Sequence, residues 1–115
     1  MSPPRIVRIV SDDDVSNALE FLMRNAKFIG AARRRLMEAE SLVKRTKALV
    51  MRQHGTLSLG AQEREAILDK SYQDAEAAVA KEAGRLEYLK ALREAHAAKI
   101  ECWRTEQSTL RSMKI

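Results

Sequence analysis

Apolar residues recur every seven positions along the first half of the chain. The positions between them hold mostly small residues, with Asn25 as a polar exception. A heptad repeat of this length predicts a supercoiled helix that packs lengthwise on another helix. The repeat consists of Val15, Leu22, Ile29, Leu36, Val43 and Val50, with Ala18, Asn25, Ala32, Ala39 and Thr46 between them. We therefore expect a first helix over residues 12–54 with these residues as its buried seam.

Ser11 marks the start of this helix. Its hydroxyl can cap backbone amides of the first turn, and Asp14 three residues later completes a capping box. Val10 before the cap and Val15 after it form a hydrophobic staple. We expect residues 1–10 to form an extended arm and residues 11–115 to form one helical domain.

The apolar pattern stops at the segment RQHGTLSLG, residues 52–60. Gly55 suits the left-handed position after a helix end, and Ser58 or Gly60 can start the next helix. We predict a turn over residues 55–60 and a second helix over residues 61–112. Its seam positions are Tyr72, Ala75, Val79, Leu86, Leu89, Ile100, Trp103 and Leu110.

The two seams match in an antiparallel hairpin. The residue numbers of each facing pair add up to the same total, as partners across a hairpin should. These pairs are Val15 with Ile100, Ile29 with Leu86, Leu36 with Val79, and Val43 with Tyr72. The predicted fold class is all-α, a long coiled-coil-like hairpin of two helices. A kink at Gly30 or Gly84 would give a three-helix bundle instead, since each glycine costs about 1 kcal/mol relative to Ala.

A single hairpin of this size buries little surface, which favours assembly into a four-helix or larger homo-oligomer. Extra apolar residues lie off the seam in the first half of helix one, and they are the candidate subunit interface: Leu19, Phe21, Met23 and Phe28. In the alternative, the N-terminal segment RIVRIV folds back over them, or over Trp103 and Leu110.

Composition indicates a reducing setting, because a single cysteine cannot form an internal disulfide. The N-terminus carries no apolar signal segment, and no run approaches the ~18 apolar residues that a membrane span needs. We expect a cytoplasmic protein (in the bacterial host cell, if a phage encodes it) with no membrane partner.

No catalytic, cofactor or metal site is expected. His54 lies beside the turn and His96 lies near the far end of helix two, about 50 Å apart in a hairpin at 1.5 Å per residue. Cys102 has no histidine or second cysteine near it in the sequence. Glu82 and Arg93 fall on seam positions, where they would control register or make a polar contact between subunits. We expect no enzymatic activity.

Charge is distributed unevenly. Residues 15–54 hold nine Lys or Arg and three acidic residues, whereas residues 55–115 hold ten of each. Six cations of helix one project away from the seam and are the candidate nucleic-acid contacts: Arg24, Lys27, Arg34, Lys44, Arg45 and Arg52. Such a stripe can follow phosphates without reading bases. The alternative is a basic helix face that is simply solvated. The run Arg33–Arg35 spreads over about 200°, because neighbouring residues are about 100° apart, so it cannot grip one phosphate.

The C-terminal stretch ALREAHAAKIECWRTEQSTLRSMKI resembles the last helix of small all-helical proteins encoded in many phage genomes. The shared residues are Arg93, Ile100, Glu101, Trp103 and Arg104, and AARRRLMEAE and QEREAIL look similar too. The resemblance loosely covers residues 15–111. Such proteins tend to be encoded near recombination and replication genes. The layout is also similar to the recombination mediators of large phages, which bind single-stranded DNA and help load a recombinase.

We therefore expect a non-enzymatic accessory protein of phage recombination or replication. It would bind DNA, single-stranded in the preferred version, or a recombinase, nuclease or other protein partner. A competing hypothesis is a protein–protein adaptor or inhibitor of a host enzyme with no nucleic-acid contact. A third is a helical packaging or tail component of a virion. The sequence does not identify the partner or the number of subunits.

Overall fold

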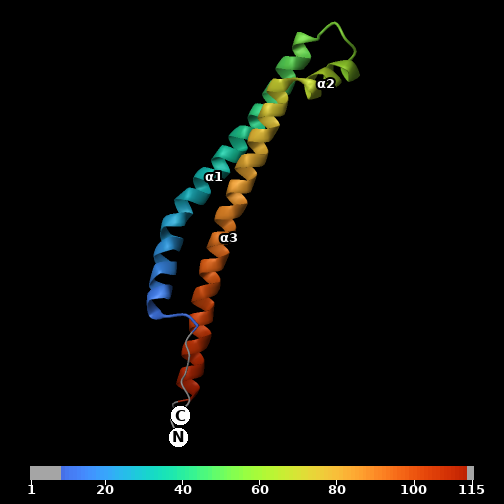
Figure 1. The fold of residues 1–115 in the computed structure, drawn as a ribbon. Coiled ribbons are helices and arrows are strands. Elements are labelled where there is room, and N and C mark those ends of the chain that lie inside the picture. Colours follow the sequence, from blue (N-terminus) through green and yellow to red (C-terminus); the bar gives the residue numbers. More distant parts are fainter. Residues whose placement is uncertain (1–8, 114–115) are drawn as a thin grey trace. The chain divides into compact units, whose positions relative to one another are not determined.

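The computed structural model describes residues 9–113, which form three helices and no strand (Figure 1). Helix α1 spans Asp12–Gln53, α2 spans Leu59–Leu68 and α3 spans Lys70–Met113. The predicted all-α class is confirmed for this part of the chain. The predicted arm, residues 1–10, lies almost entirely outside the described residues.

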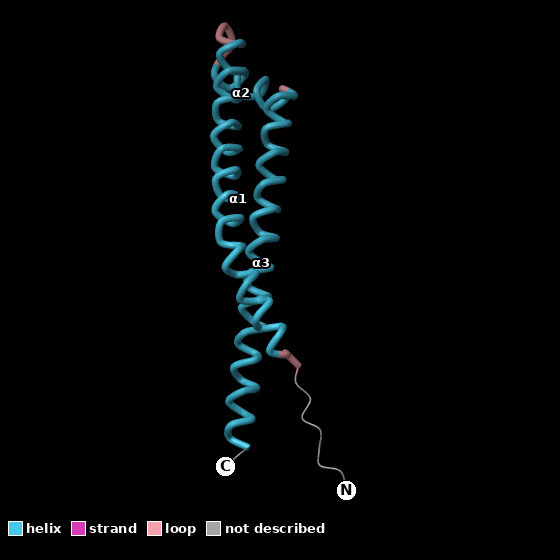
Figure 2. The backbone as a smooth tube through the Cα atoms, turned by 90° about the vertical axis from the view of Figure 1, so that its left-hand side faces the viewer, coloured by secondary structure: helices cyan, strands magenta, loops and turns pink. Residues whose placement is uncertain are grey.

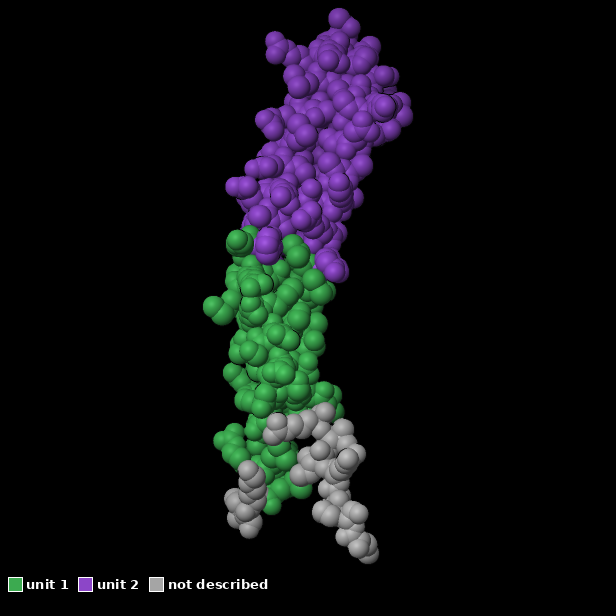
Figure 3. Space-filling model, turned by 60° about the vertical axis from the view of Figure 1, so that its left-hand side comes forward, with its two compact units in different colours: residues 1–27, 89–115 green, residues 28–88 purple. Residues whose placement is uncertain are grey.

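The chain divides into two compact units, coloured separately in Figure 3. Unit 1 comprises residues 1–27 and 89–115, and unit 2 comprises residues 28–88. Each unit contains one part of α1 and one part of α3, and the two helices run in opposite directions (Figure 2). Because the parts come from opposite ends of the sequence, the antiparallel arrangement predicted from the seams is present within each unit.

The seam of α1 is confirmed. Every predicted seam position is buried or half-buried, and the intervening positions of the helix are mostly exposed. The most buried of these positions are Val15, Ala18, Asn25, Ile29, Ala32, Ala39 and Val50. Small residues dominate this set, so the two helix backbones can approach closely.

The start of α1 contains the predicted capping box. The Asp14 backbone N–H donates to the Ser11 hydroxyl at 3.1 Å, and the Ser11 N–H donates to the Asp14 carboxylate at 3.0 Å. The hydrogen bond from the Ser11 backbone has the larger effect in lowering the pKa of Asp14, and a hydrogen bond with the Ser11 side chain lowers it further. Val10 and Val15 are 6% and 8% exposed, as the staple requires. The local sequence alone therefore specifies where α1 begins.

The end of α1 differs from the prediction. No glycine among the described residues has a positive φ, so Gly55 does not occupy the left-handed position. Instead, His54 N–H donates to Met51 O at 3.1 Å and Gly55 N–H donates to Arg52 O at 3.2 Å. These bonds to the third residue back tighten the last turn and satisfy its carbonyls, which removes the need for a left-handed residue.

The predicted second helix is in fact two helices. Ser58 caps α2, accepting from the Ala61 N–H, so Ser58 is confirmed as a helix start. The helix then breaks at Asp69, which has extended backbone angles of φ −70° and ψ 134°. The Asp69 carboxylate accepts from the Ser71 backbone N–H at 2.9 Å and from the Ser71 hydroxyl. Asp and Ser side chains compete in this way with helical hydrogen bonds, and here they start α3 afresh.

Neither glycine predicted as a possible kink interrupts a helix. Gly30 lies inside α1 and Gly84 inside α3. A Cβ added at either position would meet nothing within 4 Å. The third helix therefore arises at Asp69, and the bundle alternative based on Gly30 or Gly84 is wrong.

The seam predicted for α3 is confirmed at each of its eight apolar positions, which are buried or half-buried. The heptad frame also placed two charged residues, Glu82 and Arg93, on this seam. Glu82 is half-buried, as predicted, whereas Arg93 is exposed. Leu92 is half-buried beside it. Residues 92 and 93 are about 100° apart around the helix, so turning one of them toward the other helix turns its neighbour away. Burying leucine is favourable and burying an unpaired guanidinium is costly, so Leu92 takes the inner position.

Unit 1 is held by specific contacts between α1 and α3. The Asn25 side chain, 3% exposed, donates to the Leu89 carbonyl at 3.3 Å. Phe21 stacks on His96 with a ring-centroid distance of 4.0 Å. The Trp103 indole N–H donates to Asp12 at 2.9 Å. These partners lie within a few residues of the predicted register, which is therefore confirmed in this unit.

Unit 2 is packed with small and aliphatic side chains. Its buried residues are Ile29, Ala32, Ala39, Val50, Ala66, Ala75 and Leu86. Tyr72 is half-buried, and its hydrogen bond to Glu76 raises the pKa of the Tyr72 phenol. The core of this unit is therefore thin, and most long side chains of its helices project outward.

Candidate nucleic-acid interface

All six cations predicted to contact nucleic acid lie on α1 and are exposed. Arg24 and Lys27 belong to unit 1, whereas the other four belong to unit 2. The predicted outward orientation is therefore correct for each residue. The set nevertheless falls into two groups that belong to different units.

Two of the six cations are already paired on their own helix. Arg24 pairs with Glu20, and Arg34 lies 3.7 Å from Glu38. These side chains are more than half exposed, and such pairs contribute at most about 1 kcal/mol. Lys27 also has an interaction partner. Local acidic residues therefore compensate much of the charge in the first part of the stripe.

The remaining three cations lie in a segment of the chain that itself contains no acidic residue, although Glu38 and Glu40 precede it. Residues 41–62 contain four Lys or Arg and no Asp or Glu. Lys44, Arg45 and Arg52 are exposed and make no ion pair with any described residue. We call these three residues the basic face. Shallow hollows beside them are lined by Met37, Glu38, Ser41, Lys44 and Arg45, and by Arg45, Ala48, Leu49 and Arg52.

The basic face matches the repeat of a polyanion. Lys44 and Arg52 are eight residues apart, or about 12 Å along the helix axis. A nucleic-acid strand advances about 3.4 Å per phosphate along a duplex, so this face can reach three or four phosphates. Residues 41–62 contain no Phe, Tyr or Trp, so the face offers no base-stacking platform.

Charge in unit 2 is polarised between its helices. The α1 part, residues 28–53, carries seven basic and two acidic residues, a balance of +5. Residues 59–88 of α2 and α3 carry four basic and seven acidic residues, a balance of −3. Charge summed over all of residues 55–115 hides this difference, because the basic residues after position 88 cancel the acidic ones before it. Summing charge separately for the two halves of the hairpin would have revealed the difference.

The residues predicted as a subunit interface fall into different environments. Leu19, Met23 and Phe28 are 49%, 82% and 52% exposed. Phe21 is half-buried against His96 within its own chain. Leu19 and Met23 belong to unit 1 and Phe28 to unit 2, so these residues do not form one patch in a single unit. The proposal of an interface at these residues stays a prediction.

The residues considered for chemistry are dispersed. His54 lies in unit 2 and His96 in unit 1, where the buried His96 Nδ1 has no hydrogen-bond partner among the described residues. Cys102 is a half-buried free thiol. Within residues 9–113, no three His, Cys, Asp or Glu side chains gather as a metal site. No helix in the same range is long and apolar enough to cross a membrane.

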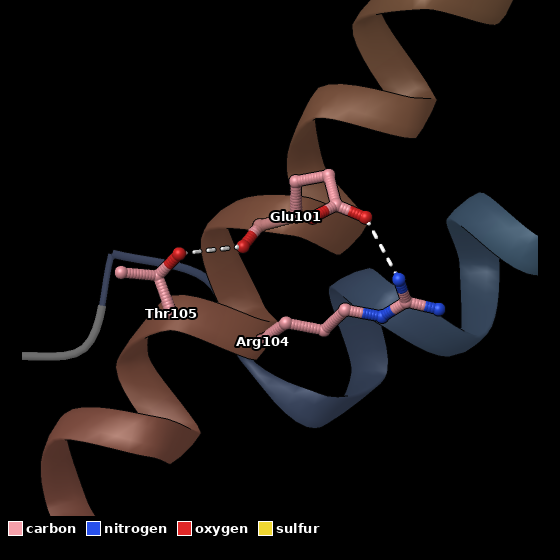
Figure 4. Close-up of polar contacts among 3 residues, drawn as sticks. All are labelled: Glu101, Arg104 and Thr105. Carbon is pink, nitrogen blue, oxygen red and sulfur yellow. Dashed lines mark hydrogen bonds and ion pairs between the residues drawn. The ribbon is translucent and has the colours of Figure 1, made fainter.

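The residues that carry the phage-protein resemblance have identifiable contacts in α3. Glu101 accepts from Arg104 at 2.9 Å, and its backbone carbonyl accepts from the Thr105 hydroxyl at 3.1 Å (Figure 4). Trp103 bonds Asp12, as described above, and Ile100 is half-buried. Arg93 is exposed. Ile100 and Trp103 are therefore seam residues of the hairpin, whereas Glu101 and Arg104 pair with each other on the exposed side of α3. Comparisons with protein families, curated proteins and solved structures find no match to this chain.

Proposed function

We propose that this chain is a non-enzymatic accessory protein that binds DNA through the basic face of α1. The observation that carries the proposal is the acid-free segment, residues 41–62, with Lys44, Arg45 and Arg52 exposed and unpaired within the described chain. Free cations bind phosphates more readily than cations that must first leave a carboxylate.

Single-stranded DNA is the preferred form of the ligand. The resemblance to phage-encoded helical proteins and recombination mediators favours it. The chemistry of the face is phosphate contact from Lys and from the planar guanidinium of Arg, which can bind two phosphate oxygens. Such contacts carry no base preference, so we expect oligonucleotides of different sequence to bind alike.

The test is a binding titration with a fluorescent oligonucleotide at low salt. The double variant Arg45→Glu/Arg52→Glu should lose most of the binding, because repulsion replaces two phosphate contacts. A matched control is Arg93→Glu/Arg111→Glu, which makes the same change of net charge at exposed positions of α3 in unit 1. The control should bind nearly as well as the unmodified chain. Equal losses in the two variants would contradict a localised face.

A protein–protein adaptor is the second candidate. It is favoured by the exposed apolar side chains of α2, since Leu59, Ile67 and Leu68 are 66%, 52% and 71% exposed on a helix of ten residues. Co-purification from cells with nuclease treatment separates the two functions. A defined partner that stays bound after nuclease, and is lost in Ile67→Glu/Leu68→Glu, would favour the adaptor.

A further inference from the structure

Unit 2 contains a groove between α1 and α3. It is a shallow groove, open to solvent, with a volume of about 500 Å³. It is lined by Val43 and Lys44 of α1, by Val79 and Ala80 of α3, and by a glutamate of each helix, Glu40 and Glu76. Its floor is apolar and its rims are charged. Val43 and Val79 are seam residues, yet both stay partly exposed. The hairpin therefore leaves part of its own core accessible here.

The charges of unit 2 indicate which surface would fit there. The α1 part carries +5, and the α3 part, residues 70–88, carries three basic and four acidic residues, a balance of −1. A second copy turned by a two-fold axis can place its α1 against α3 of the first copy. That arrangement brings Lys44 of each copy toward Glu76 of the other, and opposite charges meet twice. In the arrangement with α1 on α1, two strongly basic helices would repel one another.

We propose that this groove binds a second copy of the chain, with α1 of each copy lying against α3 of its partner in unit 2. The two copies use the same residues, as an isologous dimer requires. Val43, Val79 and Ala80 supply the apolar contact. The opposite charges of Lys44 and Glu76 favour α1 of one copy against α3 of the other. Lys44 belongs both to this groove and to the basic face, whereas Arg45 and Arg52 lie outside the groove, so Arg45 and Arg52 are the residues that test DNA binding separately.

The first test is the mass in solution, measured by light scattering over a hundredfold range of concentration. The unmodified chain should approach twice its 13.0 kDa mass. Val79→Lys should yield the single-chain mass, because it places a charge on the apolar floor. Met23→Lys, at the most exposed of the earlier candidate interface residues, should leave the mass unchanged. A chain that stays single at every concentration, or one separated by Met23→Lys and not by Val79→Lys, would overturn the proposal.

A charge swap guards against a variant that simply unfolds. Lys44→Glu and Glu76→Lys should each weaken self-association about tenfold or more, because like charges then meet across the groove. An equal mixture of the two variants should recover the doubled mass, since both cross-copy pairs are again opposite in charge. Failure of the mixture to recover would refute the pairing. Arg45→Glu/Arg52→Glu should keep the doubled mass and lose oligonucleotide binding. Self-association and DNA binding can therefore fail separately in this experiment.

Discussion

Units 1 and 2 hold the same two helices together by different means. In unit 1 the contacts are directional: Asn25 donates to Leu89, Trp103 donates to Asp12, and Phe21 stacks on His96. In unit 2 the helices meet through alanines and aliphatic side chains. Directional contacts fix a register, whereas close packing of small residues leaves the long polar side chains free to face outward. The surfaces that we propose for binding accordingly lie in unit 2.

The charges of the two units differ in sign as well as in size. In unit 1 the α1 part, residues 12–27, carries a balance of −2 and the α3 part, residues 89–113, carries +2. In unit 2 the corresponding balances are +5 and −3. Each long helix therefore becomes more basic along the chain, and the antiparallel arrangement opposes unlike charges in both units. Over these helix residues the two balances of unit 2 leave an excess of +2, which lies on α1, whereas those of unit 1 cancel.

The largest expected effect comes from the thin core of unit 2. Leu86 is 7% exposed, and Leu86→Ala should lower the free energy of unfolding by about 2–4 kcal/mol because it leaves a cavity between the helices. Chemical denaturation at fixed protein concentration, followed by circular dichroism, measures this. Leu59→Ala, at an exposed position of α2, is the control and should change stability little. A loss below about 1 kcal/mol for Leu86→Ala would indicate that unit 2 has no real core.

A smaller effect is expected from the directional contacts of unit 1. Asn25→Ala removes the hydrogen bond to Leu89 and should lower stability by about 1 kcal/mol. Asn17→Ala, an exposed change in the same helix, accounts for the difference in helix propensity. Trp103 is the sole tryptophan, so its fluorescence reports unit 1 directly. If Asn25→Ala and Asn17→Ala were equally stable, the buried asparagine would contribute nothing to the register.

The smallest expected effect is the pH dependence of stability that comes from Asp14 at the start of α1 and Asp69 at the start of α3. Hydrogen bonds from Ser11 lower the pKa of Asp14 in unit 1, and hydrogen bonds from Ser71, led by its side chain, lower that of Asp69 in unit 2. A folded-state pKa below the usual 3.8 means that each carboxylate stabilises the fold above that value and loses this effect as the pH falls below it. Asp14→Asn and Asp69→Asn should each reduce the acid sensitivity of unfolding.

Comparing urea denaturation at about pH 5 with that at about pH 3 measures this difference. Asp74→Asn, at an exposed position of α3, is the control. An unchanged acid sensitivity in both cap variants would show that neither carboxylate is bonded in solution.

The sequence predicted the features that repeat or that depend on adjacent residues. The α1 seam, its antiparallel match to α3, the Ser11–Asp14 box and the Ser58 cap are all confirmed. The break at Asp69 was missed because the predicted seam begins only at Tyr72, so no seam residue tested whether one helix continued through residues 61–71. The signal was present in Asp69 and Ser71, whose side chains satisfy the first amides of a new helix.

The candidate site could be predicted in part. The outward direction of the cations follows from the heptad frame, and the structure agrees for all six. Which cations stay unpaired could not be read from spacing. Glu20 and Glu38 stand four residues from Arg24 and Arg34 and pair with them, whereas Lys44 also has a glutamate four residues before it, Glu40, and does not pair with it. Side-chain direction decides this, because Glu40 and Lys44 line the same groove and still form no ion pair.

The salt dependence of oligonucleotide binding tests the central claim most directly. Three phosphate contacts on a single strand predict that the logarithm of affinity falls with the logarithm of salt concentration with a slope of about −2. Arg45→Glu/Arg52→Glu should bring that slope close to zero, while Arg93→Glu/Arg111→Glu should leave it unchanged. A slope near zero for the unmodified chain, or the same slope in both variants, would contradict binding through the basic face of α1.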